Sequence, residues 1–343
     1  MTACAFITGV CGVALTAAER AFLREARPWG LILFKRNIET PAQVEALTAS
    51  FRDAVGTDAP VLVDQEGGRV QRLGPPEWPS YPAAALYGRL YDQDQAAGLA
   101  AARLGARLMA EDLRRLGIDV DCLPVADVPA AGADAVIGDR AYGDRADKVA
   151  ALAAAAAAGL MEGGVLPVVK HLPGHGRATA DSHLKLPVVS ATREELEATD
   201  FAAFRPLAAL PLGMTAHVVF DAYDPVTPAT TSVTIVHQVI RDSIGFKGLL
   251  MSDDVSMEAL SGSIAQRASA ALAAGCDLVL HCNGRLEEMQ AVAAEAAPLT
   301  GEAGRRAAAA LAARRTPAVI DVADARAMFA AVLDRPADAR RAS

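Results

Sequence analysis

Short apolar segments alternate with longer amphipathic or alanine-rich segments along almost the whole chain. The short segments are rich in Val, Ile and Leu, which favours strands, whereas the longer ones repeat their apolar residues at helical spacing. The predicted strands are 5–10, 31–35, 60–64, 118–126, 165–170, 213–219, 248–252 and 276–281. The predicted helices are 16–27, 41–55, 94–116, 145–162, 192–209, 233–244, 263–274 and 286–297. Eight alternations predict an α/β protein with a (β/α)8 TIM barrel in a single domain.

A doubly wound open sheet is the alternative, because periodicity cannot distinguish a closed sheet from an open one. Its Gly-x-Gly-x-x-Gly fingerprint after the first strand is absent. Caps support several helices: Thr16 begins a capping box, Ser190 or Thr192 precedes an Arg-Glu-Glu-Leu helix start, and Gly117 ends a long helix. No linker divides the chain, so we expect a catalytic barrel over 1–300. Terminal helices and a polar tail are expected over 301–343, packed on the barrel or extending from it.

Composition narrows the class of protein. The chain has 343 residues, 52% of them hydrophobic, and a formal net charge of −8. This balance argues against nucleic acid or an anionic membrane as partner. Five cysteines without a Cys-x-x-Cys pair predict reduced thiols, and the N-terminal segment is interpreted as a strand rather than a signal peptide. The longest apolar run, 149–161, is too short to cross a bilayer. We therefore expect a cytoplasmic protein, monomeric or weakly dimeric.

Polar residues gather where the predicted strands end. Lys170 and His171 close one strand, His217 follows another, and Asp253 and Asp254 close a third. The remaining strand ends carry the segments 64–69, 127 and 281–283. The carboxyl ends of barrel strands meet on one face, and that face holds the active site in such folds.

Two groups of residues suggest acid and base chemistry. Asp253 and Asp254 are candidates for a carboxylate nucleophile, and since successive strand residues point to opposite sides, one of them should face the barrel mouth while the other caps or pairs nearby. In Asp181-Ser182-His183 a carboxylate can orient an imidazole and raise its basicity. A zinc site at His171 and His175 is the alternative, although Pro173-Gly174 argues against the helix that this spacing requires.

Charged residues near the same strand ends could bind a sugar. Carboxylates accept hydrogen bonds from paired hydroxyls, and Arg and Lys donate to them. Arg69 or Arg72 could instead pair with Glu66 on the surface. Gly67-Gly68 is a weak signal for a phosphate loop because the lysine and serine of a P-loop are missing. His217 fits ligand contact and a supporting role equally well. The candidates for hydroxyl binding are Asp64, Arg72, Arg140, Lys170 and His171.

Taken together, these motifs resemble family 3 of the glycoside hydrolases, and within it the single-domain bacterial β-N-acetylglucosaminidases of cell-wall recycling. The similar stretches follow the family order over nearly the whole chain. They are 31–37, 63–72, 137–143, 170–176, 181–183, 214–217 and 252–257. Leu172 replaces a common phenylalanine and Val255 a common leucine, and neither change removes a functional group.

The resemblance implies a retaining exo-β-N-acetylglucosaminidase (a β-N-acetylhexosaminidase) that releases N-acetylglucosamine from anhydro-muropeptides, without a metal or other cofactor. Asp253 matches the nucleophile that forms the covalent glycosyl-enzyme. His183 matches the acid/base, and Asp181 its paired carboxylate. The residues implied to hold the sugar ring are Asp64, Arg72, Arg140, Lys170 and His171, with His217 as a further candidate.

Four alternatives stay open. A β-glucosidase of the same family is the nearest, although such members usually carry an additional domain. A phosphorylase is possible because a neutral imidazole repels an incoming anion less than a second carboxylate would. A sugar-binding barrel without activity would lack Asp253 or the Asp181–His183 pair, and all three are present. Insensitivity to a chelator would exclude a metal-dependent hydrolase.

Overall fold

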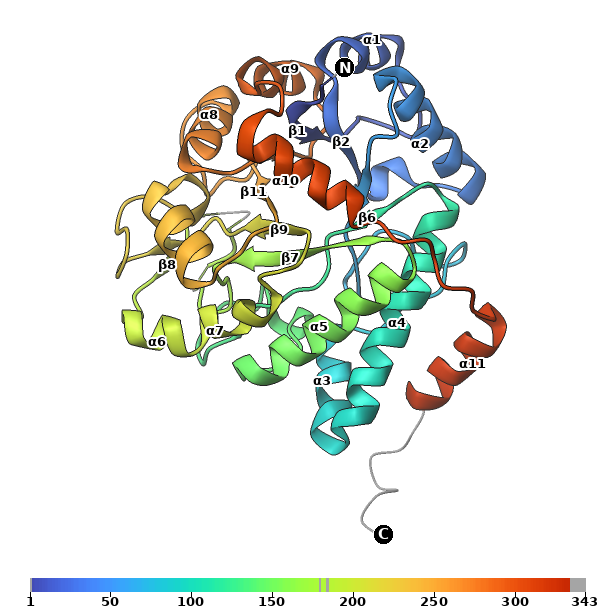
Figure 1. The fold of residues 1–343 in the computed structure, drawn as a ribbon, viewed down its shortest axis with the longest axis vertical. Helices are drawn as coiled ribbons and strands as arrows, with labels where there is room; N and C mark the ends of the chain where they lie inside the picture. Colours follow the sequence, from blue (N-terminus) through green and yellow to red (C-terminus); the bar gives the residue numbers. More distant parts are fainter. Residues whose placement is uncertain (1, 179, 183–184, 334–343) are drawn as a thin grey trace.

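Eight parallel strands close into a barrel in the computed structural model, which describes residues 2–178, 180–182 and 185–333 (Figure 1). Around the ring the order is β1, β2, β3, β6, β7, β9, β11 and β12, and β12 pairs with β1 to close it. The predicted single-domain (β/α)8 barrel is confirmed, and the open sheet is excluded. The barrel strands are β1 (Cys4–Thr8), β2 (Pro28–Leu33), β3 (Val61–Val63), β6 (Val120–Asp121), β7 (Leu166–Leu172), β9 (Leu212–Thr215), β11 (Leu249–Asp254) and β12 (Leu278–His281).

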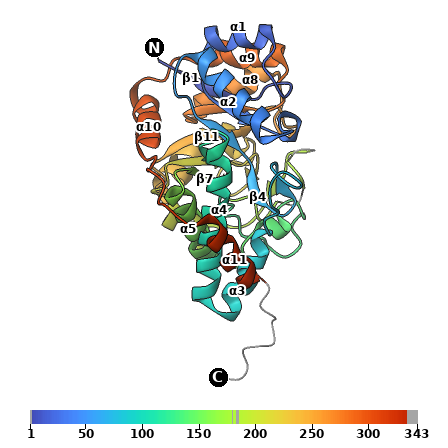
Figure 2. The same cartoon turned by 90° about the vertical axis from the view of Figure 1, so that its right-hand side faces the viewer.

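Helices surround the barrel (Figures 1 and 2). The expected caps at Thr16, Thr192 and Gly117 are confirmed: the two threonines accept from the backbone N–H three residues on, and Gly117 follows the last turn of α4 with φ +73°. The α-helices are α1 (Ala17–Ala26), α2 (Pro41–Val55), α3 (Ala84–Gln93), α4 (Gln95–Arg115), α5 (Ala146–Glu162), α6 (Arg193–Ala198), α7 (Asp200–Phe204), α8 (Ile264–Ala274), α9 (Leu286–Glu295), α10 (Gly301–Ala312) and α11 (Val322–Leu333). The short 3-10 turns are η1 (Lys35–Asn37), η2 (Gly138–Arg140), η3 (Arg205–Leu207) and η4 (Ala229–Thr231).

Several predicted boundaries are wrong. The strand predicted over 118–126 narrows to β6, since Pro124 interrupts the regular pairing. The strand predicted over 213–219 splits, and its last residues form β10 (Val219–Phe220), which pairs with β8 (Val188–Val189) outside the barrel. The helix predicted over 192–209 breaks at Thr199 into α6, α7 and η3. The helix predicted over 233–244 is the π-helix η5 (Ile235–Ser243).

Two elements near the site were not predicted. One is α3, and the other is an antiparallel hairpin of β4 (Gln65–Gly67) and β5 (Val70–Gln71) that rises directly after β3. The hairpin strands are short and mostly polar, without the alternation that marks a strand. Helix α3 buries Ala84, Tyr87 and Leu90 at helical spacing, a pattern that the sequence prediction missed.

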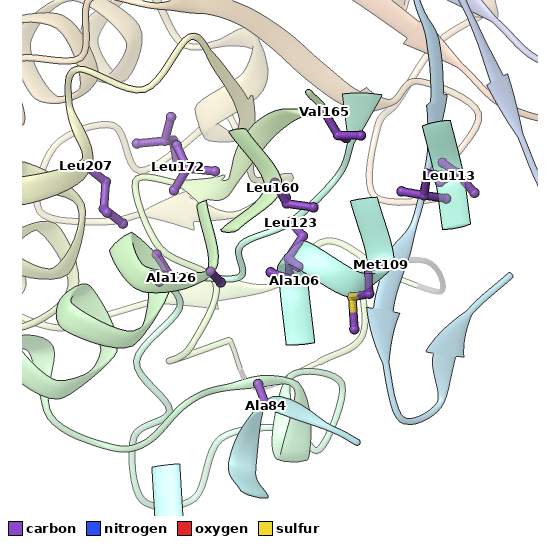
Figure 3. Close-up of a cluster of buried hydrophobic side chains, with 14 of the residues drawn as sticks. Ala84, Ala106, Met109, Leu113, Leu123, Ala126, Leu160, Val165, Leu172 and Leu207 are labelled. Carbon is purple, nitrogen blue, oxygen red and sulfur yellow. The ribbon is translucent and has the colours of Figure 1, made fainter. Parts of the chain in front are cut away.

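Apolar side chains fill the space between the barrel and its helices. In Figure 3, Leu160 of α5 lies near Leu123, which follows β6, and Val165, which precedes β7. A second buried cluster joins β1, β11 and β12 to α8, α9 and α10. Full burial of one such aliphatic side chain contributes roughly 1.5–3 kcal/mol. The two clusters fix the strands, so the residues at the strand ends are held on rigid supports.

The C-terminal helices pack on two sides of the barrel. Arg306 of α10 pairs with Asp277 at the start of β12, Nη1 to Oδ1 2.9 Å. Helix α11 lies against α4, where Phe329 is buried beside Tyr81 (Figures 1 and 2). No helix within the described ranges is long and apolar enough to cross a membrane.

Candidate active site

Polar side chains from separate strand ends line one cavity of about 270 Å³ at the carboxyl end of the barrel. It brings together seven of the nine residues predicted for the site, namely Asp64, Arg72, Arg140, Lys170, His171, Asp181 and Asp253. His217 is fully buried and is not among the residues that line the cavity. His183, predicted as the acid/base, lies outside the described residues.

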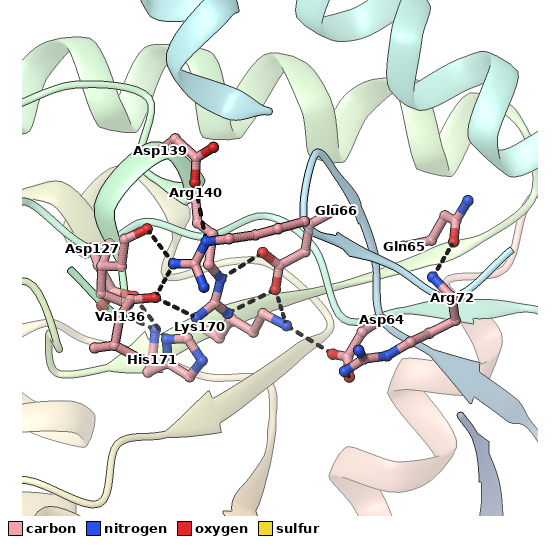
Figure 4. A network of polar contacts seen from close by, with 12 residues as sticks. Asp64, Gln65, Glu66, Arg72, Asp127, Val136, Asp139, Arg140, Lys170 and His171 are labelled. Atoms are coloured by element: carbon pink, nitrogen blue, oxygen red, sulfur yellow. Dashed lines mark hydrogen bonds and ion pairs between the residues drawn. The ribbon is translucent and has the colours of Figure 1, made fainter. Parts of the chain in front are cut away.

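Lys170 is the centre of a buried charge cluster (Figure 4). Its ammonium group lies 2.9 Å from Asp64 Oδ1 and 2.7 Å from Glu66 Oε1, and the side chain is 2% exposed. Lys170 lies on β7, in one wall of the cavity. Asp64 follows β3 and Glu66 lies on β4, in a neighbouring wall. One cation therefore ties two neighbouring walls of the cavity together.

Two arginines complete the cluster. Arg140 donates from Nε and Nη2 to the two oxygens of Glu66, both at 2.8 Å, and Arg72 Nη2 lies 2.9 Å from Asp64 Oδ2. The suggestion that Arg69 or Arg72 pairs with Glu66 is wrong: Arg69 lies at the rim and pairs with Asp139, Nε to Oδ1 3.2 Å. A bidentate arginine holds a carboxylate more rigidly than a single contact does.

The charge cluster is ionised at neutral pH. Burial raises the pKa of Asp64, but Lys170 and Arg72 outweigh it and bring the pKa well below its usual range. Burial lowers the pKa of Lys170, and Asp64 and Glu66 reverse this and raise it well above its usual range. Fixed charges of both signs can donate to and accept from sugar hydroxyls without rearranging.

His171 is oriented by Asp127. Asp127 Oδ2 lies 2.7 Å from His171 Nδ1, and Oδ1 accepts the backbone N–H of His175 at 2.7 Å. The backbone N–H of His171 adds a contact of 3.3 Å to Oδ1. Because the carboxylate holds Nδ1, it leaves Nε2 as the imidazole atom able to meet a ligand.

The ring of His175 contacts the hydroxyl of Ser182. Its Nε2 lies 3.0 Å from Ser182 Oγ, and burial, followed by His171, lowers the pKa of its ring to about 4. Within the described part of the chain, no group of three or more His, Cys, Asp or Glu side chains is arranged to hold a metal ion. Each of these two histidines has one ring nitrogen in contact with a protein oxygen, Asp127 for His171 and Ser182 for His175.

The two acids that end β11 have different surroundings. Asp253 faces the cavity, and its Oδ1 accepts the backbone N–H of Asp254 at 2.8 Å. Asp254 also borders the cavity, but its oxygens accept from the Ser256 hydroxyl at 2.6 Å and from the Cys282 N–H at 3.1 Å. This second acid connects the turn after β11 to the end of β12, whereas the Asp253 carboxylate faces the cavity.

Asp253 is held as a carboxylate. Burial raises its pKa, but His217, His171, the Asp254 N–H and Lys170 together bring it below its usual range. The ring of His217 contacts Thr230 Oγ1 through Nδ1 at 2.7 Å and the carbonyl oxygen of Asp254 through Nε2 at 2.9 Å. Protein atoms satisfy both nitrogens, which favours the supporting role over contact with a ligand.

Three residues that support the cavity have no role in the sequence prediction. Glu66 and Asp127 lie at predicted strand ends without a predicted contact, and nothing in the sequence indicates Thr230. Glu66 and Asp127 could have been found by asking which acid could pair with each buried lysine or histidine. No sequence signal marks Thr230, since it lies in the short turn η4, 13 residues beyond His217.

A closed β/α barrel with a carboxylate facing a small, charge-lined cavity is compatible with a glycoside hydrolase, and comparison with known proteins shows that class. Residues 8–311 match the model of the glycosyl hydrolase family 3 N-terminal domain, and the chain belongs to this family.

Named relatives agree with this assignment. The chain is 41% identical over 279 residues to a beta-hexosaminidase of Alkalilimnicola ehrlichii, covering 80% of this chain and 79% of the relative. A beta-hexosaminidase of Thioalkalivibrio sulfidiphilus is 42% identical, with 79% and 78% covered. A solved structure of NagZ from Neisseria gonorrhoeae in complex with N-trifluoroacetyl-D-glucosamine superposes with a TM-score of 0.85 at 33% identity, covering 97% of this chain and 99% of that one.

Proposed function

We propose that the protein is an exo-acting β-N-acetylglucosaminidase that removes a single N-acetylglucosamine from the non-reducing end of peptidoglycan fragments. The observation that carries the proposal is the shared cavity, in which Asp253 faces the buried Lys170 cluster. A cavity of about 270 Å³ is small for a ligand site and suits one sugar ring, which favours removal of terminal units. The beta-hexosaminidase names of the relatives support the substrate class.

The proposed chemistry is a retaining double displacement. The Asp253 carboxylate attacks the anomeric carbon and displaces the aglycone oxygen, which takes a proton from His183. The same imidazole then removes a proton from water, and the water oxygen releases the sugar from Asp253. In such sites the two catalytic groups lie about 5–5.5 Å apart. Asp181, which borders the cavity, is the carboxylate proposed to orient His183.

The sugar ring is proposed to bind against the charge cluster. Asp64 and Glu66 would accept from ring hydroxyls, while Arg72, Lys170 and His171 Nε2 would donate to them. These groups are fixed before substrate arrives, so little reorganisation is needed on binding. The anhydro-muropeptide substrate, the role in cell-wall recycling and the cytoplasmic location belong to the same proposal.

The first experiment measures release of 4-nitrophenol from its β-N-acetylglucosaminide and its β-glucoside. We expect turnover of the N-acetyl compound by the wild type and loss of at least about 10³-fold in kcat for Asp253→Ala, since the attacking group is removed. Asp221→Ala is the matched control, because this exposed carboxylate lies outside the cavity.

Each outcome has a separate meaning. Preference for the glucoside would keep the family and overturn the recycling role. Acceleration by phosphate, with a sugar phosphate as product, would indicate a phosphorylase. A 2-fluoro sugar adduct on any residue other than Asp253 would overturn the nucleophile assignment.

A further inference from the structure

Helix α11 lies beyond the family-matched residues 8–311, yet it is connected to the wall of the cavity. The helix packs on α4 on the outside of the barrel (Figure 2). Phe329 is 7% exposed, and its ring lies 6.2 Å from the ring of Tyr81 and 6.4 Å from that of Tyr87. A terminal helix that only shielded α4 would need these apolar contacts and nothing more.

A buried polar contact adds to the apolar one. Arg326 Nη2 donates to Asp112 Oδ1 of α4 at 2.6 Å, and the Tyr81 hydroxyl donates to Asp112 Oδ2, also at 2.6 Å. Asp112 and Tyr81 are both buried, whereas the Arg326 side chain is 34% exposed. Arg326 therefore neutralises the buried acid that holds the Tyr81 side chain.

The backbone of Tyr81 in turn holds the β4–β5 hairpin. Its carbonyl oxygen accepts the N–H of Gly68 at 2.8 Å, and its own N–H donates to Gln71 Oε1 at 2.8 Å. The fit is close: a Cβ on Gly67, where φ is +89°, would lie 2.3 Å from the carbonyl oxygen of Pro82. A shift of the Tyr81 backbone would therefore disturb the two hydrogen bonds that hold the hairpin.

This hairpin forms one wall of the proposed sugar site. It carries Glu66 on β4 and continues from β5 into Arg72, and both line the cavity. Gln65 closes the hairpin, since its Oε1 accepts the N–H of Arg72 at 3.1 Å. The path from α11 to the cavity is thus continuous: Arg326, Asp112, Tyr81, and then Gly68 and Gln71.

We propose that α11 is a positioning element for the sugar site, and that Arg326 acts through Asp112 and Tyr81 to hold the hairpin bearing Glu66 and Arg72. The inference rests on the proposed function. Loss of the contact should weaken binding of the sugar in the ground state and transition state alike, because the chemistry at Asp253 is on another wall. Such a loss raises KM and leaves kcat nearly unchanged.

The test compares Arg326→Ala, Arg326→Lys and the control Met328→Ala with the wild type. Met328 is on the same helix, 63% exposed, and outside the path. For 4-nitrophenyl β-N-acetylglucosaminide we expect Arg326→Ala to raise KM by about three- to ten-fold and to change kcat by less than about two-fold. Arg326→Lys should recover part of the affinity, because it keeps the charge near Asp112.

Tryptophan fluorescence can report a change in the segment around Tyr81, which supports the hairpin, independently of enzyme activity. Trp78 lies in the segment between β5 and α3 and is 8% exposed, and the chain has two tryptophans. In a Trp29→Phe background, Arg326→Ala should shift the Trp78 emission to longer wavelength, whereas Met328→Ala should leave it unchanged.

The outcomes separate this inference from the proposed function. Unchanged KM and unchanged Trp78 emission in Arg326→Ala, with only a lower melting temperature, would show that α11 is a brace for stability and overturn the inference. Equal effects in Met328→Ala would do the same. If the wild type turns over no N-acetylglucosaminide, the proposed function fails, and the Trp78 shift still decides whether α11 holds the hairpin support.

Discussion

Replacing Lys170 by methionine removes the central charge of the cluster and keeps most of the side-chain volume. Asp64 Oδ1 then loses a contact of 2.9 Å and Glu66 Oε1 one of 2.7 Å. Removing one partner of a buried ion pair typically costs about 3–5 kcal/mol. Because Arg72 and Arg140 still contact the two acids, we expect a loss near the lower end, about 3 kcal/mol of unfolding free energy.

The size of this loss should depend on pH. In the wild type the pKa of Asp64 is lowered, so its contribution to stability is present above its unfolded pKa of about 4 and lost only below that. Without Lys170, burial raises the pKa of one of the two acids. A raised pKa in the folded state means that stability is recovered as the pH falls and the acid binds a proton. The deficit of Lys170→Met should therefore be smaller at pH 5 than at pH 8.

Chemical unfolding followed by circular dichroism measures both effects. Glu66→Gln in the Lys170→Met background is the matched control, because it removes one of the two acid charges that Lys170 no longer balances and should restore at least about 1 kcal/mol. The reasoning is refuted if the deficit is the same at both pH values and the double variant is no more stable than Lys170→Met.

Three further predictions concern activity. Asp127→Asn should lower kcat/KM for the N-acetylglucosaminide by about 10- to 100-fold, because the carboxylate that orients His171 is lost; a change of less than two-fold would contradict that role. Nearby positive and N–H groups outweigh burial and lower the pKa of Asp253, so the proposed nucleophile should stay charged, and the acid limb of kcat/KM should lie below the usual aspartate range of about pH 4. A limb at pH 6 that follows the ionisation of Asp253 would be inconsistent. Dialysis against a chelator should leave kcat unchanged, and recovery of lost activity by zinc would restore the metal-dependent alternative.

The barrel could be predicted because each of its strands is a short apolar run bounded by polar residues. Their alternation with helices favours a barrel, but closure of the ring is seen only in the pairing of β12 with β1. The β4–β5 hairpin could not be predicted, since Gln65, Glu66 and Gly67 have no strand pattern of their own. They form β4 because Tyr81 and Gln71 supply the polar contacts that support the turn. Long-range contacts of this kind leave no local periodicity in sequence.

The site could be predicted as a set of residues but not as a set of contacts. The strand-end rule identified Asp64, Lys170 and Asp253 because the polarity of parallel strands brings their ends to one face. It could not assign Glu66 to Arg140 rather than to Arg69, since that choice depends on where η2 lies beside the hairpin. His217 was placed at the correct strand end, and its contact with Thr230 could only be seen in three dimensions.

Substitutions in the two walls of the cavity should change different kinetic constants. The wall proposed to bind the sugar is fixed by ion pairs among the end of β3, β7 and the hairpin, and Tyr81 supports it from outside. The wall that bears Asp253 is fixed by hydrogen bonds among β9, β11 and β12, through His217 and Asp254. Few of these contacts are shared, so changes on the first wall should mainly alter KM and changes on the second mainly kcat. Lys170 is the exception, because it pairs with Asp64 and Glu66 and also lowers the pKa of Asp253, and its replacement should therefore affect both constants.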